Sequence, residues 1–146
     1  MTTIVGDWRK KILVADSQYS DDDVGIKYHH DKVFAIDGEW FAGAGHQSDI
    51  EKVLHYLKNK LKRKPKLQNN NSFIWLRHDG LYNCDNSLDW EKTDTFIAIG
   101  SGAMAAEALL RHGLSAEEAV KGACDVDLYS SEPIKIYQLL DKDKTV

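Results

Sequence analysis

Short apolar segments joined by short polar connections constrain the fold of this chain more than any other feature of its sequence. Four segments are apolar at successive positions, so that both faces of each expected strand require burial: residues 12–15, 33–36, 73–76 and 96–99. Burial of both faces is typical of parallel sheets, but the connections are too short for parallel crossovers. A four-layer αββα sandwich meets both conditions, because two antiparallel sheets pack face to face and helices cover their outer faces. We therefore predict an α+β fold.

Tight turns predict three antiparallel hairpins. Asp37-Gly38 is the clearest of these signals, because a two-residue turn that accommodates positive φ closes neighbouring antiparallel strands. The expected strand pairs are residues 3–7 with 12–17, 33–36 with 40–44, and 73–76 with 81–82.

The first helix of the outer layers is predicted after the second hairpin. Ser48-Asp49-Ile50-Glu51 has the pattern of a capping box, and Pro65 marks the expected end of the helix. The apolar stripe that should face the sheet consists of Ile50, Val53, Leu54, Leu57 and Leu61.

Two more helices and a strand are predicted in the second half of the chain. One helix runs from about Ala103 to His112 and ends at Gly113, which can adopt a left-handed conformation. The next begins at the capping box Ser115-Ala116-Glu117-Glu118. We expect it to turn Ala119, Val120 and Ala123 inward, and we expect a last strand built around Ile134, Ile136 and Leu139.

Length and composition fit a single domain spanning residues 1–146. Hydrophobic residues make up 42% of the chain and the net charge is -4, which gives no general attraction to nucleic acid or anionic membranes. No stretch approaches the roughly 18 apolar residues of a membrane span, and nothing resembles a secretory signal, so we expect a cytoplasmic protein. Cys84 and Cys124 match no metal-ligand spacing and are expected to be small, partly buried apolar residues.

Two charged or histidine-rich segments have simpler explanations than a binding site. The basic residues 58–64 lie at an expected helix C-terminus, where cations are favoured, and lack interleaved aromatic residues, so we predict a solvated helix end. His29-His30-Asp31, with His46 further on, fits no familiar zinc spacing, and we predict no metal site.

Gly100-Ser101-Gly102 follows an expected strand and opens an expected helix, in the form of the G-x-G-x-x-A fingerprint of dinucleotide-binding folds. That fingerprint requires a further parallel strand ending in an acidic residue, and another capped helix occupies the corresponding region here. We therefore predict no cofactor. The segment remains a tight turn from strand to helix that would position Ser101 beside a site.

The second residue is a candidate nucleophile. Its small side chain permits removal of Met1, which would leave Thr2 with a free α-amine beside its hydroxyl, a nucleophile and a base on one residue. Asp16 ends one apolar strand and Lys32 precedes another, so both charges are expected at the rim of the sandwich. The sequence leaves open whether they form a pair or are two unrelated surface charges.

Five segments in register resemble proteasome β subunits, and most of all the HslV-type peptidases. They are Thr2–Val5 with Val14–Gln18, Asp31–Val33, Ala44–Asp49, Ile97–Gly102, and Asp127–Ser130, in this order along nearly the whole chain. The family consists of N-terminal nucleophile (Ntn) hydrolases with a four-layer αββα sandwich, which agrees with the architecture predicted from the strands and turns.

The resemblance implies roles for seven residues. Thr2 would be the nucleophile, and its freed amine the general base, acting through a water. Lys32, held by Asp16, would lower the proton affinity of the hydroxyl and amine, and the Gly45 N–H would form the oxyanion hole. The residues that would orient the amine and the water are Ser101, Asp127 and Ser130.

The resemblance also implies the reaction and the partners. It indicates a threonine endopeptidase that cleaves peptides or unfolded proteins in a homo-oligomeric ring, with an AAA+ unfoldase as a further partner. Many members have a second long helix that packs between subunits, whereas here only residues 65–72 lie between the first helix and the next strand. Two alternatives remain open: a non-catalytic Ntn-fold assembly or scaffold protein, and an amidohydrolase acting on a small-molecule amide.

Overall fold

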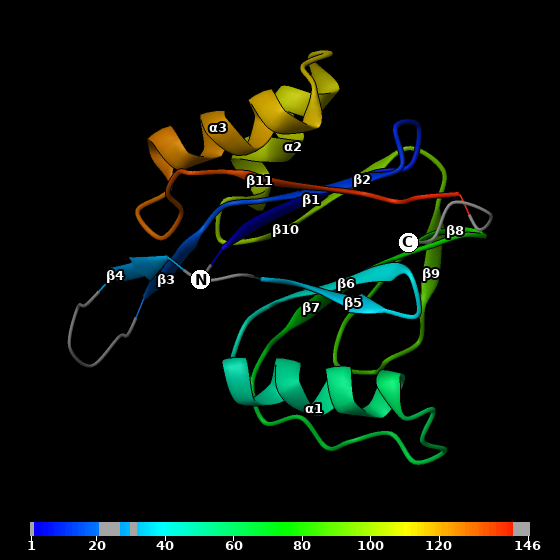
Figure 1. Ribbon diagram of the computed structural model, residues 1–146. Helices are drawn as coiled ribbons and strands as arrows, with labels where there is room; N and C mark the ends of the chain where they lie inside the picture. Colours follow the sequence, from blue (N-terminus) through cyan, green and yellow to red (C-terminus); the bar gives the residue numbers. More distant parts are fainter. Residues whose placement is uncertain (1, 21–26, 30–31, 142–146) are drawn as a thin grey trace.

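The computed structural model describes residues 2–20, 27–29 and 32–141 of the chain. Two antiparallel sheets pack face to face, with two helices, α2 (Ala103–Arg111) and α3 (Ala116–Val126), on one outer face and α1 (Gln47–Lys58) on the other (Figure 1). The predicted α+β fold, a four-layer αββα sandwich, is confirmed.

The first sheet has the strand order β10-β1-β2-β11, and its neighbouring strands are antiparallel. All five residues of β1 are buried, because this strand lies between β2 and β10 and is covered on both faces. The strands are β1 (Thr3–Asp7), β2 (Ile12–Ala15), β10 (Phe96–Gly100) and β11 (Lys135–Gln138).

The second sheet has the order β5-β6-β7-β8-β9, again with antiparallel neighbours. Its strands are β5 (Val33–Ile36), β6 (Glu39–Ala44), β7 (Ser72–Arg77), β8 (Gly80–Cys84) and β9 (Glu91–Thr93). The three predicted hairpins are therefore confirmed. Strand β9 and the small sheet of β3 (Gln18–Ser20) and β4 (Lys27–His29) were not predicted, because three polar residues are too few to show a periodic pattern.

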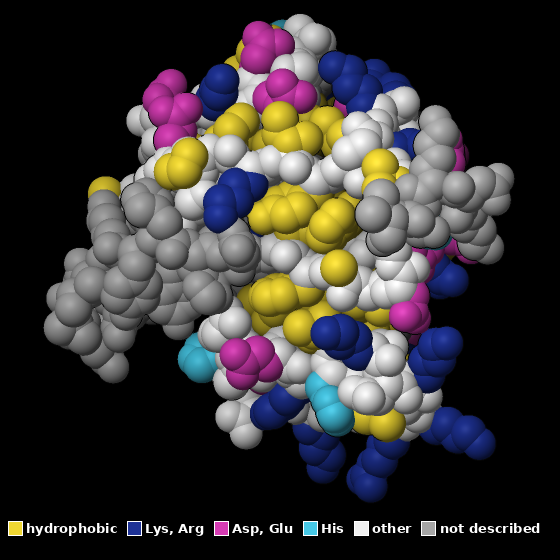
Figure 2. Space-filling model, in the orientation of Figure 1, with side chains coloured by type: hydrophobic (Ala, Val, Ile, Leu, Met, Phe, Trp, Pro, Cys, Tyr) yellow, Lys and Arg dark blue, Asp and Glu magenta, His cyan; other side chains and the backbone are white. Residues whose placement is uncertain are grey.

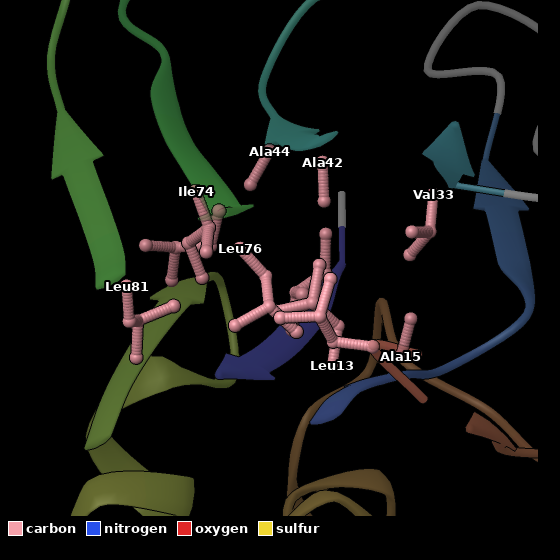
Figure 3. Close-up of a cluster of buried hydrophobic side chains, with 11 residues drawn as sticks. Leu13, Ala15, Val33, Ala42, Ala44, Ile74, Leu76 and Leu81 are labelled. Atoms are coloured by element: carbon pink, nitrogen blue, oxygen red, sulfur yellow. The ribbon is translucent and has the colours of Figure 1, made fainter. Parts of the chain in front are cut away.

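Successive residues of the apolar strands face different layers, as the two-sided burial predicted. Leu13 and Ile74 lie in the cluster between the two sheets, which Figure 3 shows with side chains from both sheets pointing toward one another. Val14 packs in the cluster under α2 and α3, and Phe73 in the cluster under α1. The central cluster consists of Ile4, Leu13, Ala15, Val33, Ala42, Ala44, Ile74, Leu76, Leu81, Ile99 and Leu139.

The predicted start of the first helix was wrong. The helix begins at Gln47, so Ser48 lies inside the first turn and cannot serve as the cap of a capping box. The N-cap residue is His46, whose side chain makes no capping hydrogen bond. The Ser48 hydroxyl instead lies 2.9 Å from the His46 ring nitrogen Nδ1.

The predicted end of this helix was also wrong. It ends at Lys58, well before Pro65, because the Asn59 side-chain amide donates to a backbone carbonyl of the last turn and Lys60 adopts a left-handed φ of 50°. Leu61 consequently lies outside the helix and is 44% exposed. The basic residues 58, 60 and 62–64 are exposed, and Figure 2 shows Lys and Arg side chains gathered at the α1 end of the molecule.

The predictions for the second half of the chain are largely confirmed. Helix α2 is followed by Gly113 with a φ of 87°, and the capping box of α3 forms between Ser115 and Glu118. Ile136 in the last strand is 50% exposed, so this edge strand buries less than expected. Among the described residues, no helix is long and apolar enough to cross a membrane.

Candidate active site

The Thr2 hydroxyl lies at the centre of a polar cluster at one end of the sandwich. It donates to Asp16 Oδ1 at 2.5 Å, and Lys32 Nζ donates to Thr2 Oγ1 at 2.5 Å. Lys32 Nζ also lies 2.8 Å from Asp16 Oδ1. The two charges whose pairing the sequence left open therefore form an ion pair, and Thr2 contacts both members.

The register of the first sheet brings Thr2 and Asp16 together. Thr2 immediately precedes β1 and Asp16 immediately follows β2, and these strands pair antiparallel with Ile4 opposite Ala15. Thr3 completes the connection, since the Asp16 N–H donates to its carbonyl at 3.1 Å and the Thr3 N–H donates to Asp16 Oδ1 at 2.9 Å. Tertiary packing of the second sheet is needed to add Lys32.

The ion pair is shielded from solvent. The Asp16 side chain is fully buried and that of Lys32 is 9% exposed. Burial lowers the pKa of the Lys32 ammonium, and the charge of Asp16 opposes this effect. A cation held this close in a site of low dielectric stabilises negative charge on the Thr2 oxygen, so the arrangement can activate the hydroxyl for nucleophilic attack.

Ser101, Asp127 and Ser130 form a second hydrogen-bonded group beside the first. Asp127 Oδ2 accepts from Ser101 Oγ at 2.6 Å and from Ser130 Oγ at 2.5 Å. Ser101 Oγ also lies 3.3 Å from the Thr2 carbonyl oxygen, and Ser130 Oγ lies 2.7 Å from Thr3 Oγ1. Both ends of the group are therefore connected to the first two residues of the described chain.

The Gly-Ser-Gly turn is explained by its close approach to the start of β1. Gly100 has a φ of 99°, and a Cβ there would lie 1.9 Å from the Thr2 carbonyl oxygen. A Cβ at Gly102 would lie 1.9 Å from Thr3 Oγ1. Both glycines are thus needed for backbone packing around Thr2, which gives the G-x-G pattern a reason that involves no dinucleotide.

Gly45 follows β6 in the turn that leads into α1. Ala44, the residue before it, packs with Ile4 and Ala15 between the sheets. In Figure 1 this turn and the start of β1 lie at the same end of the sandwich. Gly45 has a φ of 142°, and a Cβ there would lie 2.1 Å from Asn71 Oδ1.

Sequence reasoning missed several residues that complete the site. Thr3 is fully buried, and the Ser131 N–H donates to Asp16 Oδ2 at 3.1 Å. Asn71 contacts the turn at Gly45, although its segment reads as an ordinary polar loop. No composition or spacing signal marks these residues, because their roles depend on backbone groups and on distant contacts.

Some candidates lie outside the described residues. Met1, His30 and Asp31 are among them, so the structure does not address the removal of Met1 or the histidine cluster. Within the described ranges, no three His, Cys, Asp or Glu side chains are placed to hold a metal ion. Cys84 is buried and Cys124 partly buried, both as free thiols, as predicted.

No protein-family profile matches the chain, and no curated protein sequence matches it.

Two solved structures are similar in fold. Eukaryotic HslV from Trypanosoma brucei superposes with a TM-score of 0.75 at 22% identity, covering 93% of this chain and 98% of that one. BPH from Thiobacillus denitrificans, in complex with epoxomicin, superposes with a TM-score of 0.70 at 17% identity, covering 96% of this chain and 100% of that one. The chain therefore has the proteasome-like fold of HslV and BPH over nearly its whole length.

Proposed function

We propose that this protein is a threonine peptidase whose nucleophile is the hydroxyl of Thr2, made N-terminal by removal of Met1. The observation that supports this most is the position of Thr2 Oγ1, 2.5 Å from Lys32 Nζ and 2.5 Å from Asp16 Oδ1. The likeness in fold to HslV, and to BPH bound to epoxomicin, supports the same reaction class.

The reaction begins when the Thr2 oxygen attacks the carbonyl carbon of the scissile amide. The hydroxyl proton passes, through a water, to the free α-amine, whose ordinary pKa of roughly 7.7 to 8.0 leaves part of it unprotonated at neutral pH. Lys32 stabilises the developing alkoxide by its charge, and Asp16 holds Lys32 in place. The proposed role of Ser101, Asp127 and Ser130 is to orient the amine and the water.

The tetrahedral intermediate carries its negative charge on the former carbonyl oxygen, toward which the Gly45 N–H donates. A single donor of this kind contributes about 3 kcal/mol of barrier lowering. Collapse of the intermediate breaks the C–N bond, and the leaving amine takes the proton held by the α-amine. Water then attacks the resulting ester on Thr2 and releases the acid.

We also propose that copies of the chain associate, as a homo-oligomer that encloses the sites. Three apolar side chains next to the Ser101–Asp127 group are strongly exposed: Met104 at 87%, Val126 at 73% and Leu128 at 69%. Apolar side chains gathered on one surface are typical of contacts between proteins. A ring that receives peptides or unfolded proteins from an AAA+ unfoldase in the cytoplasm is the fuller form of this proposal.

The test combines intact mass with covalent labelling. We expect protein from its native host to lack Met1 and to gain one adduct with a threonine-directed inhibitor such as a peptide epoxyketone. Thr2→Ala should lose labelling by roughly 10⁴-fold or more, as for removal of other nucleophiles, while the thermal midpoint changes little. A retained Met1, or equal labelling of Thr2→Ala, would refute the proposal.

Two alternatives have different outcomes. A non-catalytic Ntn-fold scaffold would associate without any labelling of Thr2. An amidohydrolase acting on small molecules would be labelled at Thr2 and yet remain a stable monomer in size-exclusion chromatography.

A further inference from the structure

A buried network of amides and one carboxylate holds the turn that contains Gly45. Asn71 Oδ1 accepts from the His46 N–H at 2.8 Å. Asn71 also immediately precedes Ser72, which lies opposite Ala44 in the pairing of β6 and β7. The same short stretch of chain therefore holds the residues on both sides of Gly45.

This two-sided attachment determines where the Gly45 N–H points. The N–H belongs to the peptide that follows Ala44, and the next peptide carries the His46 N–H that is bound to Asn71. The φ angle of Gly45 sets the direction of its N–H relative to the following peptide. At 142°, this angle lies in a region open chiefly to glycine. Because Asn71 Oδ1 occupies the space beside the Gly45 Cα, rotation of this turn is also sterically opposed.

Asp49 in turn fixes the orientation of the Asn71 amide. Asn71 Nδ2 donates to Asp49 Oδ2 at 3.0 Å and to Asn86 Oδ1 at 3.0 Å. A flipped amide would place its NH₂ group against the His46 N–H and its oxygen against a carboxylate, so only one orientation satisfies both ends.

Asp49 is itself immobilised. It is fully buried and accepts from the Asn69 N–H at 3.0 Å and from the Gln68 N–H at 3.3 Å. It also lies in the first turn of α1, where the helix dipole favours a negative charge. The network thus connects the start of α1, the loop before β7 and the turn after β6.

We propose that Asn71 and Asp49 are positioning residues that hold the Gly45 N–H in the direction required of an oxyanion donor. This inference rests on the proposed peptidase function. Neither side chain touches the reacting atoms. Their effect is expected in the rate of bond formation and not in the binding of a substrate or inhibitor.

The first test replaces one hydrogen atom of the network, the one on the His46 backbone nitrogen, by the Cδ of a proline ring, which also displaces the Asn71 side-chain oxygen. His46→Pro deletes the backbone N–H that Asn71 binds, at a φ of -87° that proline can approach, and His46→Ala keeps that N–H and removes only the exposed ring. With a peptide epoxyketone as the probe, we expect the maximal rate of adduct formation to fall at least about tenfold in His46→Pro, part of the effect of losing an oxyanion donor. The inhibitor concentration for half-maximal rate should not change. His46→Ala should match the wild type.

A second pair of variants changes side chains of the network and leaves the His46 backbone N–H in place. Asn71→Ala should show the same loss in maximal rate, together with faster hydrogen exchange of the His46 amide. Asn86→Ala removes another partner of the same Asn71 amide but leaves its bond to His46, so its maximal rate should stay near that of the wild type.

The outcomes separate this inference from the function on which it rests. If wild-type protein is labelled and both His46→Pro and Asn71→Ala, shown to be folded, react at the wild-type rate, the positioning role is refuted and the peptidase stands. If wild-type protein is not labelled, the proposed function fails. In that case the hydrogen-exchange rate of the His46 amide in Asn71→Ala still tests the network. An unchanged rate refutes the network, whereas a faster rate supports the role of Asn71 in holding the turn.

Discussion

Asp16 and Asp49 are both buried carboxylates that accept backbone N–H groups at the same end of the molecule, but only Asp16 also binds a buried ammonium and a hydroxyl. Asp16 binds the Lys32 ammonium and the Thr2 hydroxyl, two groups that can change their protonation. Asp49 binds amides of the loop before β7, including those of Asn69 and Asn71. In the proposed mechanism the first carboxylate holds the charge beside the nucleophile, and the second holds the backbone of the turn at Gly45.

The cations near these carboxylates also differ in their surroundings. Lys32 Nζ lies 2.8 Å from Asp16, and the Lys32 side chain is 9% exposed. Lys52 Nζ lies 3.9 Å from Asp49, and the Lys52 side chain is 43% exposed. The first contact is a shielded ion pair, whereas the second is a solvent-screened contact on a helix surface.

The largest effect is expected when each cation is removed in turn. Lys32→Met removes the ammonium that compensates the buried charge of Asp16, so it should lower the free energy of unfolding by about 3–5 kcal/mol and the labelling rate by roughly 100-fold or more. Lys52→Met should change the free energy of unfolding by less than about 1 kcal/mol and leave labelling unchanged. Denaturant titration and labelling kinetics measure both. Equal effects of the two substitutions would erase the distinction between the sites.

A smaller effect is expected from Asp49→Asn. The new amide cannot accept all the N–H groups that now face the carboxylate, so the free energy of unfolding should fall by about 2 kcal/mol. The labelling rate should fall by roughly tenfold because the Gly45 turn loosens, well short of removing a donor outright. A labelling loss as large as that of Lys32→Met would mean that Asp49 also acts in the chemistry.

The pH dependence of stability tests Asp49 without mutating the active-site cluster. Burial by itself would raise the pKa of Asp49, but hydrogen bonds from Asn71 and Asn69 outweigh it and lower the pKa to about 2, from an ordinary 3.8. A carboxyl with a lowered folded-state pKa stabilises the fold above the unfolded pKa, and this contribution is lost as the pH falls from about 4 to 2. The difference in stability between wild type and Asp49→Asn should therefore shrink across this range. A constant difference would show that the carboxylate charge does not matter.

The smallest effect is expected in the capping box of α3, where the side chains of Ser115 and Glu118 each accept the other residue's backbone N–H. The box is exposed, so Ser115→Ala should lower the free energy of unfolding by about 1 kcal/mol and leave labelling unchanged. Thermal unfolding and labelling kinetics measure the two quantities. A change in labelling would indicate that the α3 end of the molecule is coupled to Thr2.

Much of the fold was predictable because strand length, turn chemistry and two-sided burial all favour the same architecture. The exceptions have local causes. Strands β3, β4 and β9 have three residues each and no apolar pattern. Helix α1 stops at Lys58 because Lys60 adopts a left-handed conformation, for which a lysine side chain has no particular preference. Ser48 and Glu51 have the spacing of a capping box, but the helix begins two residues earlier than that box requires.

The site was only partly predictable. The resemblance to proteasome β subunits named Thr2, Asp16, Lys32 and Gly45, but it did not reveal how their positions are maintained. Asn71 is one of three successive asparagines in a polar loop, and its bond to the His46 N–H joins residues from different elements. Such a bond leaves no trace in composition or periodicity, because either partner is unremarkable in its own segment.

The sequence by itself determined the layers, since apolar periodicity and turn residues act over a few neighbouring positions. It also determined which residue types are available near the start of the chain: a threonine, an aspartate and a lysine. Only the tertiary structure decided that Asp16 and Lys32 form a pair around Thr2, and that Asp49 holds the turn at Gly45 instead. Both outcomes depend on the packing of one sheet against another, and the burial that makes those charges effective exists only once the two sheets have met.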